Sequence, residues 1–163
     1  MGELADRLDN IRLHVRIPGT EIEADLRDRN NVTISFGDGG YEFLNERNLE
    51  HYLATIARLL YVGWVREYRV AIEGTAIVIP EPENQADRDY IAARSEMEVT
   101  GASADGRVEI SAIGMRDPQV RIARGTVREL SEAEFLTRTK EAVEALTEDY
   151  RTKIRALKVR FFT

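Results

Sequence analysis

Apolar and polar residues alternate along three successive segments near the start of the chain. The first covers residues 11–17 and ends at Pro18, and the same period of two returns over 22–26 and over 32–36. A period of two places every second side chain on one face of a strand. These segments therefore predict a three-stranded meander with one buried face.

A glycine-rich run, residues 37–40, follows the third segment. Its glycines allow positive φ, and Tyr41 and Phe43 resume the alternation, so we interpret the run as a hairpin turn into a return strand. A phosphate-binding loop is the competing interpretation. The lysine and the Ser/Thr of such a loop are missing, and a predicted strand follows the run instead of a helix.

The period then changes to that of a helix, with Asn48 as the expected N-cap. The far end of this helix is open to two interpretations. In one, Gly63 ends the helix and residues 68–79 form a hairpin. In the other, the helix runs to Ile72 and Gly74 caps it. We favour the long helix.

The same order of elements then returns. Residues 80–95 combine prolines, acids and a short helical pattern around Tyr90, which predicts a linker with a short helix. Three alternating segments follow over residues 96–122. Ser131 and Glu134 then form a capping box that opens a long helix.

The two halves also resemble each other in sequence, since residues 32–35 can be laid over 108–111, and Tyr68 over Tyr150. A meander with one apolar face cannot shield that face alone. We therefore predict an α+β fold of two βββα units packed as a pseudo-two-fold pair. The predicted division is a first unit at 1–79, a linker with a short helix at 80–95 and a second unit at 96–163.

Composition narrows the class of protein. The chain of 163 residues has a net charge of −6 and no cysteine, so disulfides and thiolate chemistry are excluded. The longest apolar window, 53–65, is shorter than the roughly 20 residues of a membrane span. The start of the chain has no apolar core of a secretory signal. We expect a soluble, cytoplasmic protein with no membrane partner.

The sequence offers little for catalysis. Only two histidines occur, His14 and His51, and neither stands in a recognisable triad or metal-ligand spacing. We expect no catalytic residues, no metal site and no cofactor, and hence a non-enzymatic protein.

The C-terminal helix carries the clearest functional pattern, a run of cations after Asp149 with no intervening acid. Clustered cations are typical of phosphate binding, although cations at a helix C-terminus also complement the helix dipole. The candidate nucleic-acid-binding residues are Arg151, Lys153, Arg155, Lys158 and Arg160.

The second half resembles a known family. The run Gly-Ala-Ser-Ala-Asp-Gly at 101–106, the strand residues 107–110 and 120–122, and the long helix after Leu130-Ser131-Glu132 are similar to the YbaB/EbfC family of nucleoid-associated proteins. The resemblance covers about residues 90–160. It implies a helix, a meander and a long helix, pairing as a homodimer, and DNA binding without enzymatic activity.

Two function classes follow. The resemblance favours a DNA-binding or nucleoid-associated protein that uses the basic C-terminal helix and binds duplex DNA. Residues 1–95 hold 17 Asp and Glu against 11 Lys and Arg. This acidic first half favours a protein-interaction or secretion-accessory module with a protein partner and no DNA binding. Because family members pair, a homodimer of this chain is a further expectation.

Overall fold

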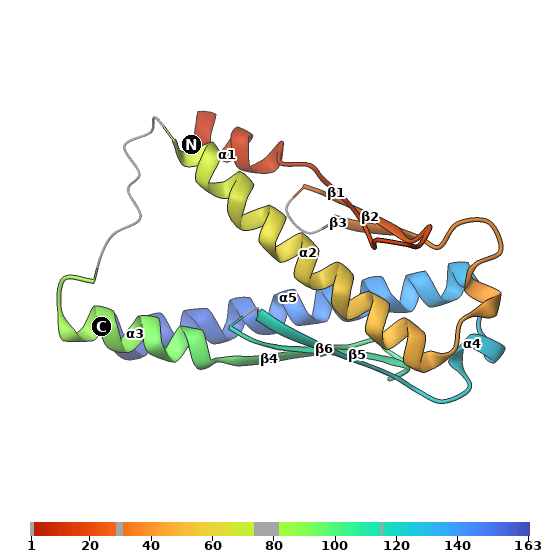
Figure 1. The fold of residues 1–163 in the computed structure, drawn as a ribbon. Helices are drawn as coiled ribbons and strands as arrows, with labels where there is room; N and C mark the ends of the chain where they lie inside the picture. The colour runs from red at the N-terminus through yellow and green to blue at the C-terminus, as the bar shows by residue number, and fades with distance from the viewer. Residues whose placement is uncertain (1, 29–30, 74–81, 115) are drawn as a thin grey trace.

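The computed structural model describes residues 2–28, 31–73, 82–114 and 116–163. It is an α+β fold with two three-stranded antiparallel sheets of the same strand order (Figure 1). The first half contains α1 (Gly2–Asp9), β1 (Leu13–Arg16), β2 (Glu23–Arg27), β3 (Asn31–Ser35), the 3-10 helix η1 (Tyr41–Phe43) and α2 (Glu46–Ile72). The second half contains α3 (Gln85–Glu96), β4 (Glu98–Ala102), β5 (Val108–Ile113), β6 (Arg116–Ile122), α4 (Thr126–Glu129) and α5 (Glu132–Phe162).

Both predicted meanders are confirmed. In the first sheet Leu26 of β2 pairs with Leu13 on one side and with Val32 on the other, so one face is apolar across all three strands. In the second sheet Ile110 of β5 pairs in the same way with Gly101 and Val120. The alternation of apolar residues was thus sufficient to place the strands and their buried faces.

The return strand predicted after residues 37–40 is wrong, because Tyr41 to Phe43 form η1. Tyr41 is buried, and its ring centroid lies 5.8 Å from that of Phe36 and 5.5 Å from that of Phe135. This aromatic cluster joins the first half to α5. The glycine run is therefore a connection into the core and not a hairpin turn.

The long helix is confirmed, since α2 runs to Ile72. The alternative hairpin is wrong, because its predicted first strand, residues 68–72, is helical. Residues 74–79, which include the predicted cap Gly74, lie outside the described residues. The N-cap is Asn45 and not Asn48. The Asn48 N–H donates to the Asn45 side chain at 2.8 Å and the Asn45 N–H donates back to the Asn48 side chain at 3.1 Å, a reciprocal capping box.

Further differences concern helices that were not predicted, element boundaries and the overlay of the two halves. Helices α1 and α4 were not predicted, and α3 extends beyond the short pattern around Tyr90. Strand β6 starts at Arg116 and includes Pro118, which is tolerated because β6 is an edge strand. The overlay of 32–35 on 108–111 is also wrong as a structural match, because β3 is a third strand and β5 a central one.

The two long helices lie between the two sheets (Figure 1). Helix α5 packs on β4 and β5, where its backbone lies directly against Gly101. Helix α2 packs on β6 of the second sheet and on β1 of its own sheet, where Gly63 meets Leu13. None of the described helices combines the length and apolar character needed to span a membrane.

Candidate functional site

The five candidate basic residues lie on α5 but do not share one face. A helix turns about 100° per residue, so residues three, four or seven apart lie close in direction. Arg151, Arg155 and Lys158 therefore lie on one side of the helix. Lys153 and Arg160 lie on the opposite side. The structure thus divides the predicted site into two groups.

Lys153 belongs to the packing of α5 on the second sheet. Its ammonium donates to the carbonyl of Glu98 at 2.8 Å and pairs with Asp149 at 3.0 Å. The Asp149 carboxylate also accepts the Thr100 N–H at 2.9 Å. This hydrogen bond, with further help from the Lys153 ammonium, holds the pKa of Asp149 below its ordinary value. Lys153 is therefore already bound to the edge strand β4.

Arg160 also contacts another side chain of the protein. Its guanidinium lies 5.0 Å from the centroid of the Phe161 ring, within cation–π range. Phe161 and Phe162 in turn lie 6.4 Å and 5.1 Å from the ring of Tyr90 on α3. This aromatic contact holds α3 alongside the end of α5.

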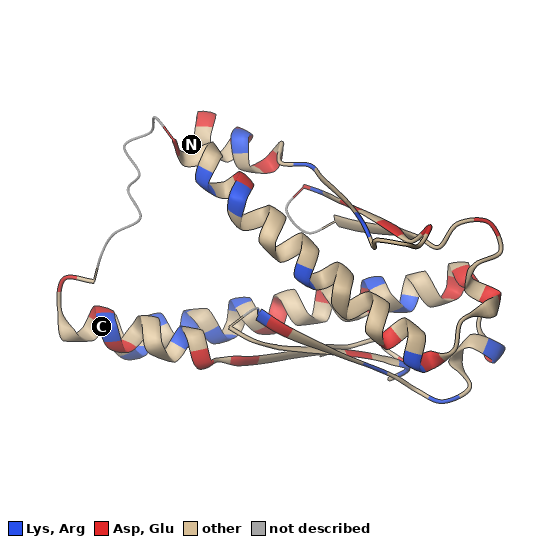
Figure 2. Cartoon of the chain, viewed as in Figure 1, with Lys and Arg blue, Asp and Glu red and all other residues tan. Residues whose placement is uncertain are grey.

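The other group, which we call the basic face, consists of Arg151, Arg155 and Lys158. All three are exposed, and among the residues that the structure describes Arg151 forms one ion pair, at 3.8 Å, with exposed Glu148. Within the described residues Arg155 and Lys158 make no hydrogen bond or ion pair. Figure 2 places this positive charge toward the C-terminal end of α5. The basic face can therefore offer its charge to an anionic partner.

Two exposed apolar residues, Val159 and Phe162, lie beside these cations on the helix surface. Phe162 is eleven residues after Arg151, which returns it to nearly the same direction. The basic face is thus bordered by apolar surface.

The histidines show no catalytic arrangement in the described part of the chain. His14 lies in β1 with its Nδ1 2.9 Å from the Asp25 carboxylate on β2, and this hydrogen bond raises the pKa of His14. His51 is an exposed residue of α2 whose ring lies near Tyr52. No group of three His, Asp or Glu side chains in the described ranges is placed to hold a metal ion.

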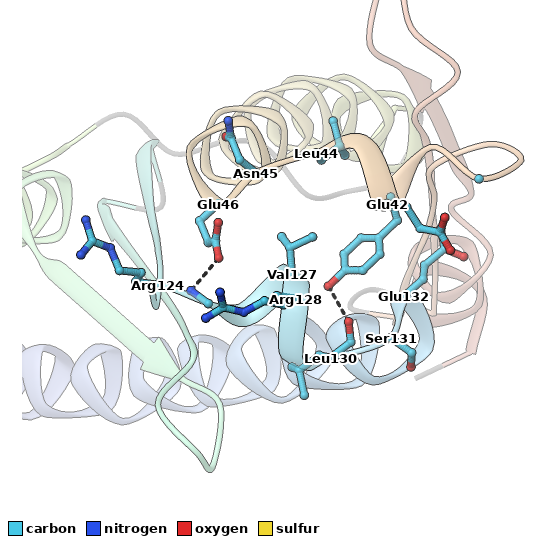
Figure 3. Close-up of a pocket in the computed structure, with 13 residues that line it drawn as sticks. Glu42, Leu44, Asn45, Glu46, Arg124, Val127, Arg128, Leu130, Ser131 and Glu132 are labelled. Carbon is cyan, nitrogen blue, oxygen red and sulfur yellow. Dashed lines mark hydrogen bonds between the residues drawn. The ribbon is translucent and has the colours of Figure 1, made fainter.

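Sequence reasoning missed a hollow of about 1010 Å³ where the two halves meet (Figure 3). It lies between η1, the N-termini of α2 and α5, and α4. Its charged lining residues have both signs: Glu42, Glu46 and Glu132 face a region that also carries Arg124 and Arg128. Because carboxylates and guanidinium groups line the same hollow, the lining favours neither an anionic nor a cationic ligand.

The hollow is instead a junction of the halves. The Gly125 N–H donates to Glu46 at 2.7 Å, and the Tyr41 hydroxyl donates to the Leu130 carbonyl at 3.2 Å. Burial, reinforced by the carboxylate of Glu46 and by those of α5, raises the pKa of Tyr41 to about 12. Tyr41 therefore stays a hydrogen-bond donor at neutral pH. Its position near glycines gave no signal of this role in the sequence.

Comparisons of the chain with protein-family models, with curated proteins and with solved structures found no match.

Proposed function

We propose that the protein is a non-enzymatic member of the YbaB/EbfC type in which two units are fused and packed as a pseudo-two-fold pair. Each half runs from a helix through a three-stranded meander to a long helix, which is the unit that the resemblance implied. Helix α2 of the first half lies on β6 of the second sheet. Such crossing of a helix to the other unit supports a chain that serves as its own dimer partner, with a two-fold relation that is only approximate because α5 packs mainly on its own sheet.

We further propose that the basic face of α5 binds duplex DNA. The observation that carries this proposal is that Arg155 and Lys158 are exposed and have no charge or hydrogen-bond partner in the described residues. Cations of this kind can displace the counterions of phosphates, whereas Lys153 is already bound to protein. The proposed contact residues are therefore Arg151, Arg155 and Lys158.

The test is a titration of labelled duplex DNA at several salt concentrations. Three phosphate contacts give a slope of about −2 to −3 for log K against log salt. The double variant Arg155→Glu/Lys158→Glu is expected to abolish binding at low salt. Absence of binding by the wild-type protein at low salt would show that the DNA proposal is wrong.

The matched control is Arg47→Glu/Arg58→Glu, which makes the same change of net charge on exposed positions of α2. Because the protein carries a net charge of −6, added negative charge alone weakens association at long range. Equal losses in the two double variants would assign the effect to net charge and contradict a site on α5.

A second candidate function is protein interaction without DNA binding, in the manner of a secretion-accessory module. Exposed Val159 and Phe162 beside the cations favour it, because an apolar and basic surface suits an acidic partner protein with an apolar anchor. Loss of partner binding in a Val159→Ser variant, which leaves the contact of Phe162 with Tyr90 in place, would support this alternative if the wild-type protein does not bind DNA.

A further inference from the structure

A cavity of about 300 Å³ lies in the middle of the molecule, apart from the basic face. Its walls are the inner faces of both sheets and the facing sides of α2 and α5. Trp64, the only tryptophan of the chain, is one of the lining residues.

The cavity arises because the two long helices pack unequally on the sheets. Helix α2 lies against both sheets, through β1 and β6, but α5 contacts mainly β4 and β5. A gap consequently remains between α5 and β3. A second hollow of about 240 Å³ occupies that gap and shares Val32, Ile34, Thr139 and Val143 with the cavity. The cavity thus continues toward the surface along β3.

The lining contains no charged side chain. Two of its polar groups are already satisfied: the Thr139 hydroxyl donates to the Phe135 carbonyl at 3.1 Å and the Thr147 hydroxyl to the Val143 carbonyl at 2.9 Å. Tyr61 and Trp64 are the remaining polar lining residues. Neither side chain has a hydrogen-bond acceptor among the residues that the structure describes, and they are neighbours on α2.

These features define the chemistry of an occupant. A charged group would lose its hydration in the cavity without gaining a partner. Burial of an apolar body in the cavity instead lowers the free energy, because its surface leaves water. A single acceptor oxygen can accept a hydrogen bond from Tyr61 or Trp64. The volume is at the lower end of the range of small-molecule sites. Tyr61 is 38% exposed, so this part of the lining is open to solvent.

We propose that the cavity binds a small uncharged molecule that has an apolar body and one hydrogen-bond acceptor. The site is independent of the proposed DNA contact, because none of its lining residues belongs to the basic face. Its failure and the failure of the DNA proposal are therefore separate results.

The test uses the intact protein with hexanol, octanol and decanol as probes and Trp64 fluorescence as the signal. A bound probe removes water from the indole, so we expect a saturable shift of the emission to shorter wavelength and a rise in Tm. Affinity is expected to grow with chain length until the cavity is full. A change that never saturates, or none at all, would overturn the proposal.

Two variants fill the cavity from opposite walls, Val143→Phe from α5 and Ala57→Leu from α2. Each is expected to weaken binding by about tenfold or more. The control Val62→Phe adds the same ring as the first variant to a residue of α2 that does not line the cavity, and it should leave affinity unchanged. Unaltered probe affinity in both filled variants would refute the site. A Trp64 emission that no probe changes in the wild-type protein would refute it as well, since it would indicate that the first sheet closes onto α5 and leaves no cavity.

Discussion

At the scale of single residues, cations that look equivalent in sequence have different roles. Lys153 fastens α5 to the backbone of β4, while Arg155 projects from the helix without a protein partner in the described residues. Lys153→Met is expected to lower the free energy of unfolding by about 1 kcal/mol and to leave DNA affinity nearly unchanged. Arg155→Met should weaken DNA binding and change stability by less than about 0.5 kcal/mol. Urea unfolding and DNA titration of both variants check this, and the reverse pattern would contradict the division of the basic run.

Asp149 makes a second residue-scale prediction, on pH. The Thr100 N–H, and after it Lys153, lowers the pKa of Asp149 in the folded protein. The unfolded chain therefore takes up the proton first as pH falls. The stabilisation is complete above the ordinary carboxyl pKa of about 4 and is lost as pH falls through the lower folded value.

Asp149→Asn should consequently be less stable than the wild-type protein at pH 7, by about 1 kcal/mol, with the difference shrinking toward pH 3. Urea unfolding at the two pH values measures this. The control is Glu148→Gln, since that exposed neighbour makes no closer ion pair within the described ranges than the one with Arg151 at 3.8 Å. A difference that stays constant with pH would show that Asp149 acts through its shape and not its charge.

At the scale of elements, a glycine sets how closely α5 approaches the second sheet. A Cβ on Gly101 would lie 2.6 Å from the Ala142 carbonyl oxygen and 2.7 Å from the carbonyl carbon of Ala145, and closer still to the amide nitrogen of Leu146. These are backbone atoms of α5 and cannot rotate away. Gly101→Ala is therefore expected to cost about 3 kcal/mol or more in stability, measured by chemical denaturation.

Gly63 is the matched control, because it also lies at a contact between a helix and a sheet. The nearest atoms that a Cβ there would meet belong to the flexible side chain of Leu13, at 3.3 Å. Alanine also favours the helical interior by about 1 kcal/mol over glycine, so Gly63→Ala should be neutral or stabilising. Similar losses in the two variants would contradict the close approach at Gly101.

The elements that sequence could predict are those whose signal is local. The alternation around Leu13 and the capping box at Ser131 each need only a few neighbouring residues, and both elements are confirmed. Tyr41 was misplaced because its partner Phe135 is far along the chain, so its burial has no local signature. For the same reason the basic run was located, but its division between Lys153 and Arg155 depends on where β4 lies.

At the scale of the whole molecule, the first turns of α2 bind the second half through two carboxylates. Glu46 accepts the Gly125 N–H at 2.7 Å and Glu50 accepts the Ile122 N–H at 2.8 Å. Ile122 ends the edge strand β6, on which α2 also packs. These bonds and the Tyr41 cluster should make the two halves unfold together. We expect Trp64 fluorescence and far-ultraviolet circular dichroism to report one transition at the same denaturant concentration.

Removal of both carboxylates tests this coupling most directly. Glu46→Ala/Glu50→Ala leaves two backbone donors without partners at the junction, so a loss of about 2–4 kcal/mol is expected. The two probes should then separate, because α2 is freed from β6 before the second sheet melts. The control is Glu42→Ala/Glu132→Ala, which removes the same charge beside the same hollow and includes an acid from the first turn of α5. Within the described residues neither of these side chains forms a hydrogen bond to the other half. An equal loss in this control would attribute the effect to helix N-terminal charge, whereas a selective loss would establish that the two meanders depend on each other through α2.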